Sequence, residues 1–249
     1  MTAETIVFAG PSIHGLSPPP SAELSIRRPA SCGDILTATL AGAKRIGLID
    51  GVFGGATAVW HKEILHALQA GVAVFGSSSM GALRAAECAG FGMIGIGEIF
   101  ADYAAGRRFA DADVAVLHAP AEFDFRPLTV ALVDAEASIE EAYRADALPR
   151  AIYERLLFCA TSMHFSKRTW PDVIAAATQS AAEASIARSA IERFERSVKR
   201  EDEALLLQGL RRFTEGDAPP TPAFTFARSV FFDALERRVV GQSLKRPRV

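Results

Sequence analysis

Short apolar runs alternate with longer helical segments over the first half of the chain. Continuous apolar runs at residues 5–9, 45–50 and 72–75 are each followed by a turn containing glycine or serine, and such runs are typical of buried strands. Two further runs, at 113–118 and 128–133, predict a fourth and a fifth strand. Each run is shorter than a typical helix.

Helix-forming segments separate these strands. Their apolar spacing and closing glycines predict helices at 35–43, 57–70, 80–89 and 98–105. Alternating strands and helices indicate an α/β fold with a mostly parallel central sheet flanked by helices. The remaining connections are predicted to be irregular: a loop rich in proline and serine at 15–31, and a glycine-punctuated link at 91–97.

The composition changes at Asp134, after which alanine, glutamate, arginine and leucine dominate. We expect a mainly helical second half, with a proline-rich linker at 216–222. The predicted helices lie near 137–145, 147–160, 171–199, 201–213 and 226–240. The chain is therefore divided into an α/β core at 1–133 and a helical region at 134–249, which can still pack against the core as one unit.

Composition and charge exclude several classes of protein. Hydrophobic residues make up 49% of the chain and charged residues 22%, so a large core is expected. A net charge of -2 and the lack of a basic stripe argue against nucleic acid as a partner. No apolar run approaches the roughly 20 residues of a membrane span. Three widely spaced cysteines without a CxxC motif argue against disulfides and structural zinc, and we expect a cytoplasmic protein.

The serine turn after the third predicted strand is the leading candidate for chemistry. The sequence Ser-Ser-Ser-Met-Gly at 77–81 has the pattern of a nucleophile elbow, centred on Ser79 or on Ser78. The N–H groups of Met80 and Gly81 would then lie at a helix N-terminus, where they can stabilise an oxyanion. The alternative is structural, because serine is also a favoured N-cap residue.

A serine nucleophile needs a base, and the sequence offers a lysine. None of the five histidines has a recognisable triad context, whereas Lys62 lies on the helix that directly precedes the serine strand. The helical wheel argues partly against Lys62, since it points away from the apolar stripe that contains Trp60 and Ile64. A surface lysine paired with a glutamate is the other interpretation.

A second candidate follows the first predicted strand. Gly10, Pro11 and Ser12 lie at its carboxyl end, the edge of a parallel sheet at which ligands bind. Ser12 is therefore a reserve nucleophile, and Gly10 and Pro11 are candidate substrate contacts. Asp50 ends the next strand at the same edge, as a site carboxylate or as a turn residue. A plain loop turn is the alternative for all four.

Several motifs together give the chain a specific resemblance. It resembles the TfuA-like family over about residues 5 to 120. Two small departures are Ser77, where alanine is expected, and a diluted acidic run at 111–113. The motifs that carry the resemblance are Gly10-Pro11-Ser12, Gly33-Asp34, Ile49-Asp50-Gly51, Trp60-His61-Lys62-Glu63-Ile64, residues 78–87 (Ser-Ser-Met-Gly-Ala-Leu-Arg-Ala-Ala-Glu) and Val114-Ala115-Val116-Leu117-His118.

The resemblance implies a function. TfuA-like proteins act beside YcaO enzymes, which use ATP to activate a peptide-bond oxygen, and the pair installs a backbone thioamide in a ribosomal peptide. The TfuA-like member is associated with hydrolysis of a thiocarboxylated, ThiS-like sulfur carrier, which delivers sulfide to the YcaO enzyme. The resemblance also implies a hydrolase-like serine–lysine site without metal or cofactor. In this chain the matching residues are Ser79 or Ser78 as nucleophile and Lys62 as base, with Ser12 as the reserve nucleophile.

Two other functions compete with this hydrolase. The chain could be a non-catalytic adaptor that binds the YcaO enzyme and improves binding of its precursor peptide, with the serines acting as caps. A Rossmann-like nucleotide binder is the third hypothesis. It is disfavoured because no GxGxxG follows the first predicted strand, and Gly10-Pro11-Ser12 is a poor substitute.

Overall fold

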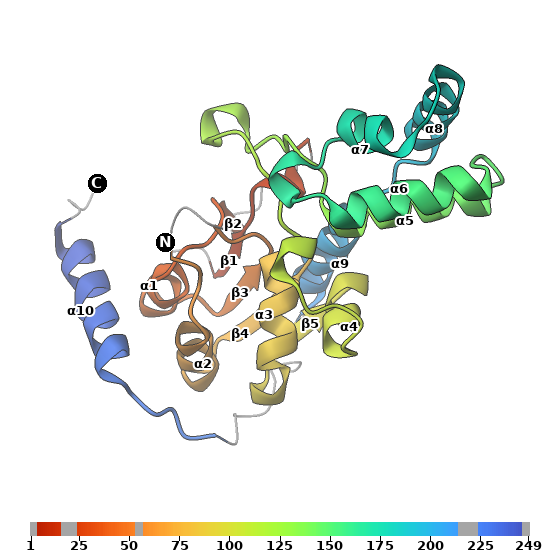
Figure 1. Ribbon diagram of the computed structural model, residues 1–249. Helices are drawn as coiled ribbons and strands as arrows, with labels where there is room; N and C mark the ends of the chain where they lie inside the picture. Colours follow the sequence, from red (N-terminus) through yellow and green to blue (C-terminus); the bar gives the residue numbers. More distant parts are fainter. Residues whose placement is uncertain (1–3, 16–23, 53–56, 214–223, 246–249) are drawn as a thin grey trace.

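A parallel sheet of five strands forms the centre of the fold in a computed structural model that describes residues 4–15, 24–52, 57–213 and 224–245 (Figure 1). The strand order is β2-β1-β3-β4-β5, and all four pairings are parallel. The strands are β1 (Thr5–Phe8), β2 (Leu24–Arg27), β3 (Arg45–Leu48), β4 (Ala73–Ser77) and β5 (Ile94–Ile96). The predicted α/β class is confirmed, and a helical C-terminal half follows.

Helices cover both faces of the sheet, because successive strand residues point to opposite sides. Ile6 and Phe8 pack against the helices on one face, and Val7 packs against a helix on the other. The first face is covered by α1 (Asp34–Leu40), α2 (His61–Gln69) and α3 (Met80–Cys88), while α4 (Glu98–Ala104) follows β5. The second face is covered by α9 (Val198–Arg212), which comes from the helical half of the chain.

The strand order decides which loops meet. The chain passes from β1 to β2 on one side and then returns to β3 on the other, so the carboxyl ends of β1 and β3 adjoin at a topological switch point. In parallel sheets a ligand typically binds at this point. The loops after β1, β3 and β4 therefore bring Ser12, Asp50 and the serine turn to one edge.

Two of the predicted strands are wrong, and two strands arise elsewhere. Residues 113–118 and 128–133 make no sheet ladder; an isolated antiparallel bridge joins His118 of the first run to Pro127, just before the second run. Their apolar side chains instead pack against α3 and α4, which gives Val114 and Val133 the burial expected of a strand. β2 lies in the predicted loop and β5 in the predicted glycine link.

The helical half is confirmed, with different boundaries. The predicted helix at 171–199 is interrupted, because the side chains of Ser180 and Ser197 each accept a hydrogen bond from the backbone N–H three residues later and so begin new helices. The predicted linker at 216–222 lies outside the described residues. The helices besides α9 are α5 (Leu132–Arg144), α6 (Arg150–Ser162), α7 (Trp170–Ala177), α8 (Ala181–Phe194) and α10 (Val230–Lys245).

The helices α5 to α8 form a hydrophobic cluster of their own beside the sheet, and α10 packs on α1 (Figure 1). The helical half also completes the core, since Leu206 and Leu210 of α9 pack under the sheet. Within the described part of the chain, no helix has the length and apolar character needed to cross a bilayer.

Candidate active site

The turn between β4 and α3 holds the three consecutive serines in a strained backbone. Ser78 has a φ of 67°, a left-handed conformation that costs free energy for a residue with a Cβ. Glycines allow the close approach on which the turn depends. A Cβ on Gly76 would lie 2.1 Å from the Gly81 carbonyl oxygen, and one on Gly81 would lie 1.8 Å from the Leu48 carbonyl oxygen. This is the strand–turn–helix geometry of a nucleophile elbow.

The closeness of Gly81 to β3 yields a prediction. Gly81→Ala should lower the free energy of unfolding by about 3 kcal/mol or more, because the backbone of β3 must move to admit the methyl group. Urea unfolding measures the change. Gly90→Ala is the matched control, since a Cβ there meets no atom within 4 Å. Equal stabilities of the two variants would show that the turn does not need this close approach.

A chain of hydrogen bonds links the serine turn to the loop after β1. The Ser78 hydroxyl donates to Ser12 Oγ over 3.2 Å, and the Ser12 hydroxyl donates to Asp50 Oδ1 over 2.7 Å. The other oxygen of Asp50 accepts from the N–H groups of Gly10 and Ser12. Asp50, which is 2% exposed, thus fixes the loop and orients the Ser12 hydroxyl.

Ser79 occupies the N-cap position of α3 but does not cap it. Its side chain forms no capping hydrogen bond; the Oγ instead lies 3.5 Å from the carbonyl oxygen of Val114. A purely structural role as a helix cap requires the capping bond that is missing here. The Ser79 hydroxyl is therefore not used by the helix end, and Ser79 lines a small cavity.

Lys199 meets Ser79 at the same carbonyl. Its Nζ donates to the Val114 oxygen over 2.8 Å, so the ammonium and the Ser79 hydroxyl share one acceptor. Lys199 is 4% exposed, and it enters the site from the first turn of α9. A buried lysine and a serine therefore converge at the carboxyl edge of the sheet.

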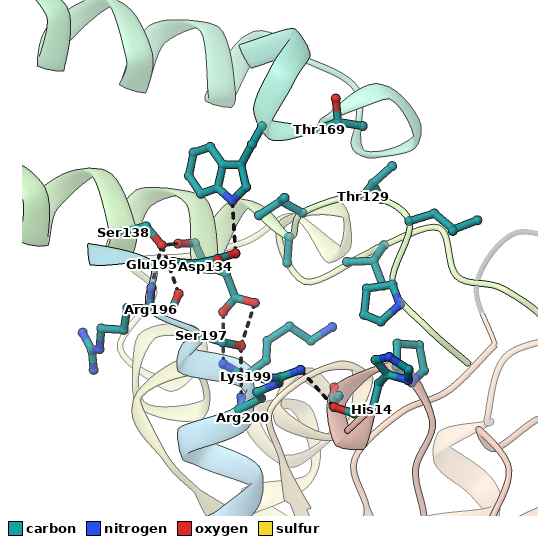
Figure 2. Close-up of a pocket in the computed structure, with 18 of the residues that line it drawn as sticks. His14, Thr129, Asp134, Ser138, Thr169, Glu195, Arg196, Ser197, Lys199 and Arg200 are labelled. Carbon is teal, nitrogen blue, oxygen red and sulfur yellow. Dashed lines mark hydrogen bonds between the residues drawn. The ribbon is translucent and has the colours of Figure 1, made fainter. Parts of the chain in front are cut away.

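Asp134 of α5 holds the start of α9 in place. One of its oxygens accepts from the Lys199 backbone N–H over 3.1 Å and the other from the Ser197 hydroxyl over 3.0 Å (Figure 2). Burial raises the pKa of Asp134, and the nearby charge of Lys199 opposes that rise. The helical half thus positions the lysine against the serine turn.

Two cavities with shared lining residues lie at this site. A small cavity of about 50 Å³ contains Ser79, Lys199 and Asp50, together with residues of the 111–118 segment. A wider cleft of about 730 Å³ lies between the loop after β1 and the helices α5 and α7 (Figure 2). Pro11, Val116 and Lys199 line both, so the two cavities lie next to each other, and Ser12 lines the cleft.

The structure does not bring Lys62 to the serines. Its ammonium lies on the outer side of α2, where it donates to the Ala227 carbonyl and sits 5.1 Å from the centre of the Phe226 ring. Lys62 also lies apart from both cavities described above. The helical wheel predicts this outward orientation. Lys62 is closer to the serines along the chain, but Lys199 is the lysine that approaches the serine turn.

The residues predicted as oxyanion and substrate contacts differ in whether their N–H groups are available to a ligand. The Gly81 N–H donates to the Ile49 carbonyl and the Gly10 N–H to Asp50, so neither is free for a ligand. Pro11 has no N–H, but it lines both cavities. Met80 lines the small cavity, and its N–H meets no acceptor among the described residues. Of these predicted contacts, the Met80 N–H is therefore the one left for a ligand in the described structure, beside the Lys199 ammonium.

Other nucleophiles and bases fit less well. His118 lines the small cavity, but its Nδ1 is engaged by the Ala119 carbonyl. Burial raises the pKa of the Cys32 and Cys88 thiols to about 11, which disfavours a reactive thiolate. Among the described residues, no cluster of three His, Cys, Asp or Glu side chains is suited to hold a metal ion.

A buried carboxyl group lies close to this site. Glu203 of α9 is 0% exposed, and neither of its carboxyl oxygens has a hydrogen-bond partner among the described residues. Burial, and then the negative charge of Asp50, raise the pKa of Glu203 to about 8. Folding therefore favours the protonated form of this carboxyl group.

Sequence reasoning missed Lys199 and Glu203, although a signal is present. Both lie on the face of α9 that continues through Leu206 and Leu210, a spacing of three to four residues. Charged residues in an otherwise apolar stripe indicate burial or function. The site at which these two side chains lie depends on how α9 packs, and the sequence does not give that packing.

Comparison with known proteins supports the resemblance. The family model described as "TfuA-like protein" matches residues 50–169, just under half of the chain. The matched segment contains Asp50, Ser79 and Val114, whereas Ser12 and Lys199 lie outside it. A search of curated proteins found no significant match.

Proposed function

Because residues 50–169 match the TfuA-like family, which supports a role as an accessory protein in thioamidation, we propose that this chain is a hydrolase that releases sulfide from a thiocarboxylated, ThiS-like carrier protein. The sulfide passes to a YcaO enzyme, which installs it in the backbone of a ribosomal peptide. The proposal assigns Ser79 as nucleophile and Lys199 as base.

One observation carries this assignment. The Ser79 hydroxyl and the Lys199 ammonium both lie within 3.5 Å of the Val114 carbonyl oxygen, in a small cavity at the carboxyl edge of the sheet. A serine beside a lysine is a nucleophile–base pair that needs no metal. The strained turn before Ser79 supplies the supporting geometry.

The reaction begins with proton transfer. Lys199 in its neutral form takes the proton of the Ser79 hydroxyl, and the Ser79 oxygen attacks the thiocarboxylate carbon. The tetrahedral intermediate carries its negative charge next to the Met80 N–H and the newly formed Lys199 ammonium, which stabilise it. This positive charge is needed, because an anionic thiocarboxylate resists attack.

The intermediate then collapses. The carbon–sulfur bond breaks, Lys199 gives its proton to the departing sulfur, and hydrosulfide (HS⁻) leaves. The carrier is now an ester of Ser79. Neutral Lys199 next deprotonates a water molecule, the water attacks the ester carbon, and the carrier leaves with an ordinary carboxylate while Ser79 recovers its proton.

Asp50, Ser12 and Ser78 support this chemistry. Their hydrogen bonds tie the loop after β1 to the serine turn, and so they fix the wall of the site opposite Lys199. Ser12 faces the cleft and Ser78 is fully buried. Either could attack in place of Ser79, and the position of a trapped acyl group would identify the nucleophile.

The isolated protein provides the decisive experiment. We expect it to release sulfide from a thiocarboxylated ThiS-like carrier without the YcaO enzyme, and rapid acid quenching followed by peptide mass spectrometry should find the carrier esterified to Ser79. The same carrier with an ordinary carboxylate is the control. No release above the spontaneous rate would favour the non-catalytic adaptor.

A further inference from the structure

Two arginines in the wide cleft have no carboxylate partner. Arg126 and Arg200 both line it, and neither forms an ion pair among the described residues. Among the described residues, the Arg200 side chain donates a hydrogen bond to the His14 carbonyl over 2.9 Å, which Figure 2 shows. Arg196, at the same cleft, differs because its guanidinium is paired with Glu98 and Glu201.

The acidic residues of the cleft are already engaged. Asp134 accepts from the start of α9, Glu195 accepts from the Trp170 indole over 3.3 Å, and Glu201 pairs with Arg196. Of the described arginines and carboxylates that line the cleft, Arg126, Arg200 and Glu195 lack an oppositely charged partner, so positive charge is in excess. The positive groups extend from the exposed Arg126 and Arg200 to the buried Lys199, which lines both the cleft and the small cavity.

We propose that this cleft binds the extended C-terminal segment of the carrier protein, with acidic side chains of that segment paired to Arg126 and Arg200. This inference rests on the proposed function. A volume of about 730 Å³ is large for a small thioacid alone and is within the range of pockets that enclose larger ligands. The planar guanidinium group matches a carboxylate with two parallel hydrogen bonds. The terminal thiocarboxylate then enters the small cavity and reaches Ser79.

Binding of short peptides tests this independently of catalysis. The probe is a fluorescein-labelled synthetic peptide that ends in an ordinary carboxylate and carries two glutamates upstream; its partner has glutamines instead. By fluorescence anisotropy, wild type should bind the glutamate peptide about tenfold or more tightly than the glutamine peptide. Arg126→Glu, Arg200→Glu and the double variant should lose that preference progressively, and added salt should weaken it.

Arg188→Glu is the matched control, because Arg188 is an exposed arginine on α8, away from the cleft lining. It should bind both peptides like wild type. Equal affinity of wild type for the two peptides, or a preference that survives both cleft substitutions, would overturn the proposal. Circular dichroism confirms that each variant is folded.

Hydrolysis of thioacetate, which has no peptide segment, separates this inference from the proposed function. In the cleft variants, hydrolysis of a thiocarboxylated peptide that carries the two glutamates should fall more than hydrolysis of thioacetate does. Charge-dependent peptide binding without hydrolysis of any thiocarboxylate would retain the cleft and refute the enzyme. Hydrolysis of thiocarboxylates without charge-dependent peptide binding would support the enzyme and refute the cleft as the binding site of the segment.

Discussion

Replacing Ser79 with alanine or Lys199 with methionine is expected to slow sulfide release from the thiocarboxylated carrier by about 10²-fold or more, because a positioned base typically contributes about 10²- to 10⁴-fold and a nucleophile more. Sulfide formation under saturating carrier measures kcat. The two losses should not add in the double variant, because the hydroxyl and the amine act in one step.

Methionine is chosen because it preserves the length and apolar stem of Lys199 but not its nitrogen. The substitution leaves the Val114 carbonyl without its 2.8 Å donor, so a modest loss of stability, about 1 to 3 kcal/mol, accompanies the loss of rate. Lys62→Met is the matched control. Its ammonium contacts Ala227 and the Phe226 ring rather than the serines, and its sulfide release should equal that of wild type.

Two further variants show which serine reacts. Ser12→Ala removes the hydroxyl between Ser78 and Asp50 and should reduce the rate less than Ser79→Ala. Loss of all activity in Ser12→Ala, with activity retained in Ser79→Ala, would transfer the role of nucleophile to Ser12. Full activity in Lys199→Met would refute the lysine as base.

The sequence predicts the part of the site that is local. Strands β1, β3 and β4 are continuous apolar runs, and parallel strands present their carboxyl ends at one edge, so the sequence alone assigns Ser12, Asp50 and Ser79 to that edge. The small residues around Ser79 likewise predict the sharp turn. These inferences depend on residues within one strand–turn–helix unit.

The lysine could not be predicted in the same way. Lys62 is close to the serines along the chain, but the orientation of α2 carries it outward. Lys199 is distant along the chain, yet α9 packs under the sheet and delivers it to Val114. The apolar segment that contains Val114 predicts a strand equally well, because burial against helices and burial in a sheet select the same residues.

Replacing Glu203 with glutamine is expected to stabilise the protein at alkaline pH. The pKa of Glu203 rises from 4.5 to about 8 on folding, first because of burial and then because of Asp50. The folded state thus holds this proton more tightly than the unfolded state does, and the free energy of unfolding falls as the pH rises from 4.5 to about 8. Since a tenfold change in proton affinity corresponds to about 1.4 kcal/mol, the full penalty above this range is at most about 5 kcal/mol.

Urea unfolding at several pH values compares wild type with Glu203→Gln. Below the lower end of the range the two should be similarly stable, and above about pH 8 the variant should be more stable by several kcal/mol. Burial also raises the pKa of Asp202 to about 6, so the difference between the proteins, rather than either curve alone, isolates Glu203. The exposed Glu192→Gln on α8 is the matched control and should follow wild type.

The same titration should affect the site. Ionised Glu203 places a second negative charge near Asp50, whose three hydrogen bonds hold the loop after β1. Because that loop forms the wall facing Lys199, wild type should lose activity above about pH 8 earlier than Glu203→Gln does. Identical pH profiles of stability in the two proteins would show that Glu203 is not neutral in the folded state, and the fully buried carboxyl would then need a partner outside the described residues.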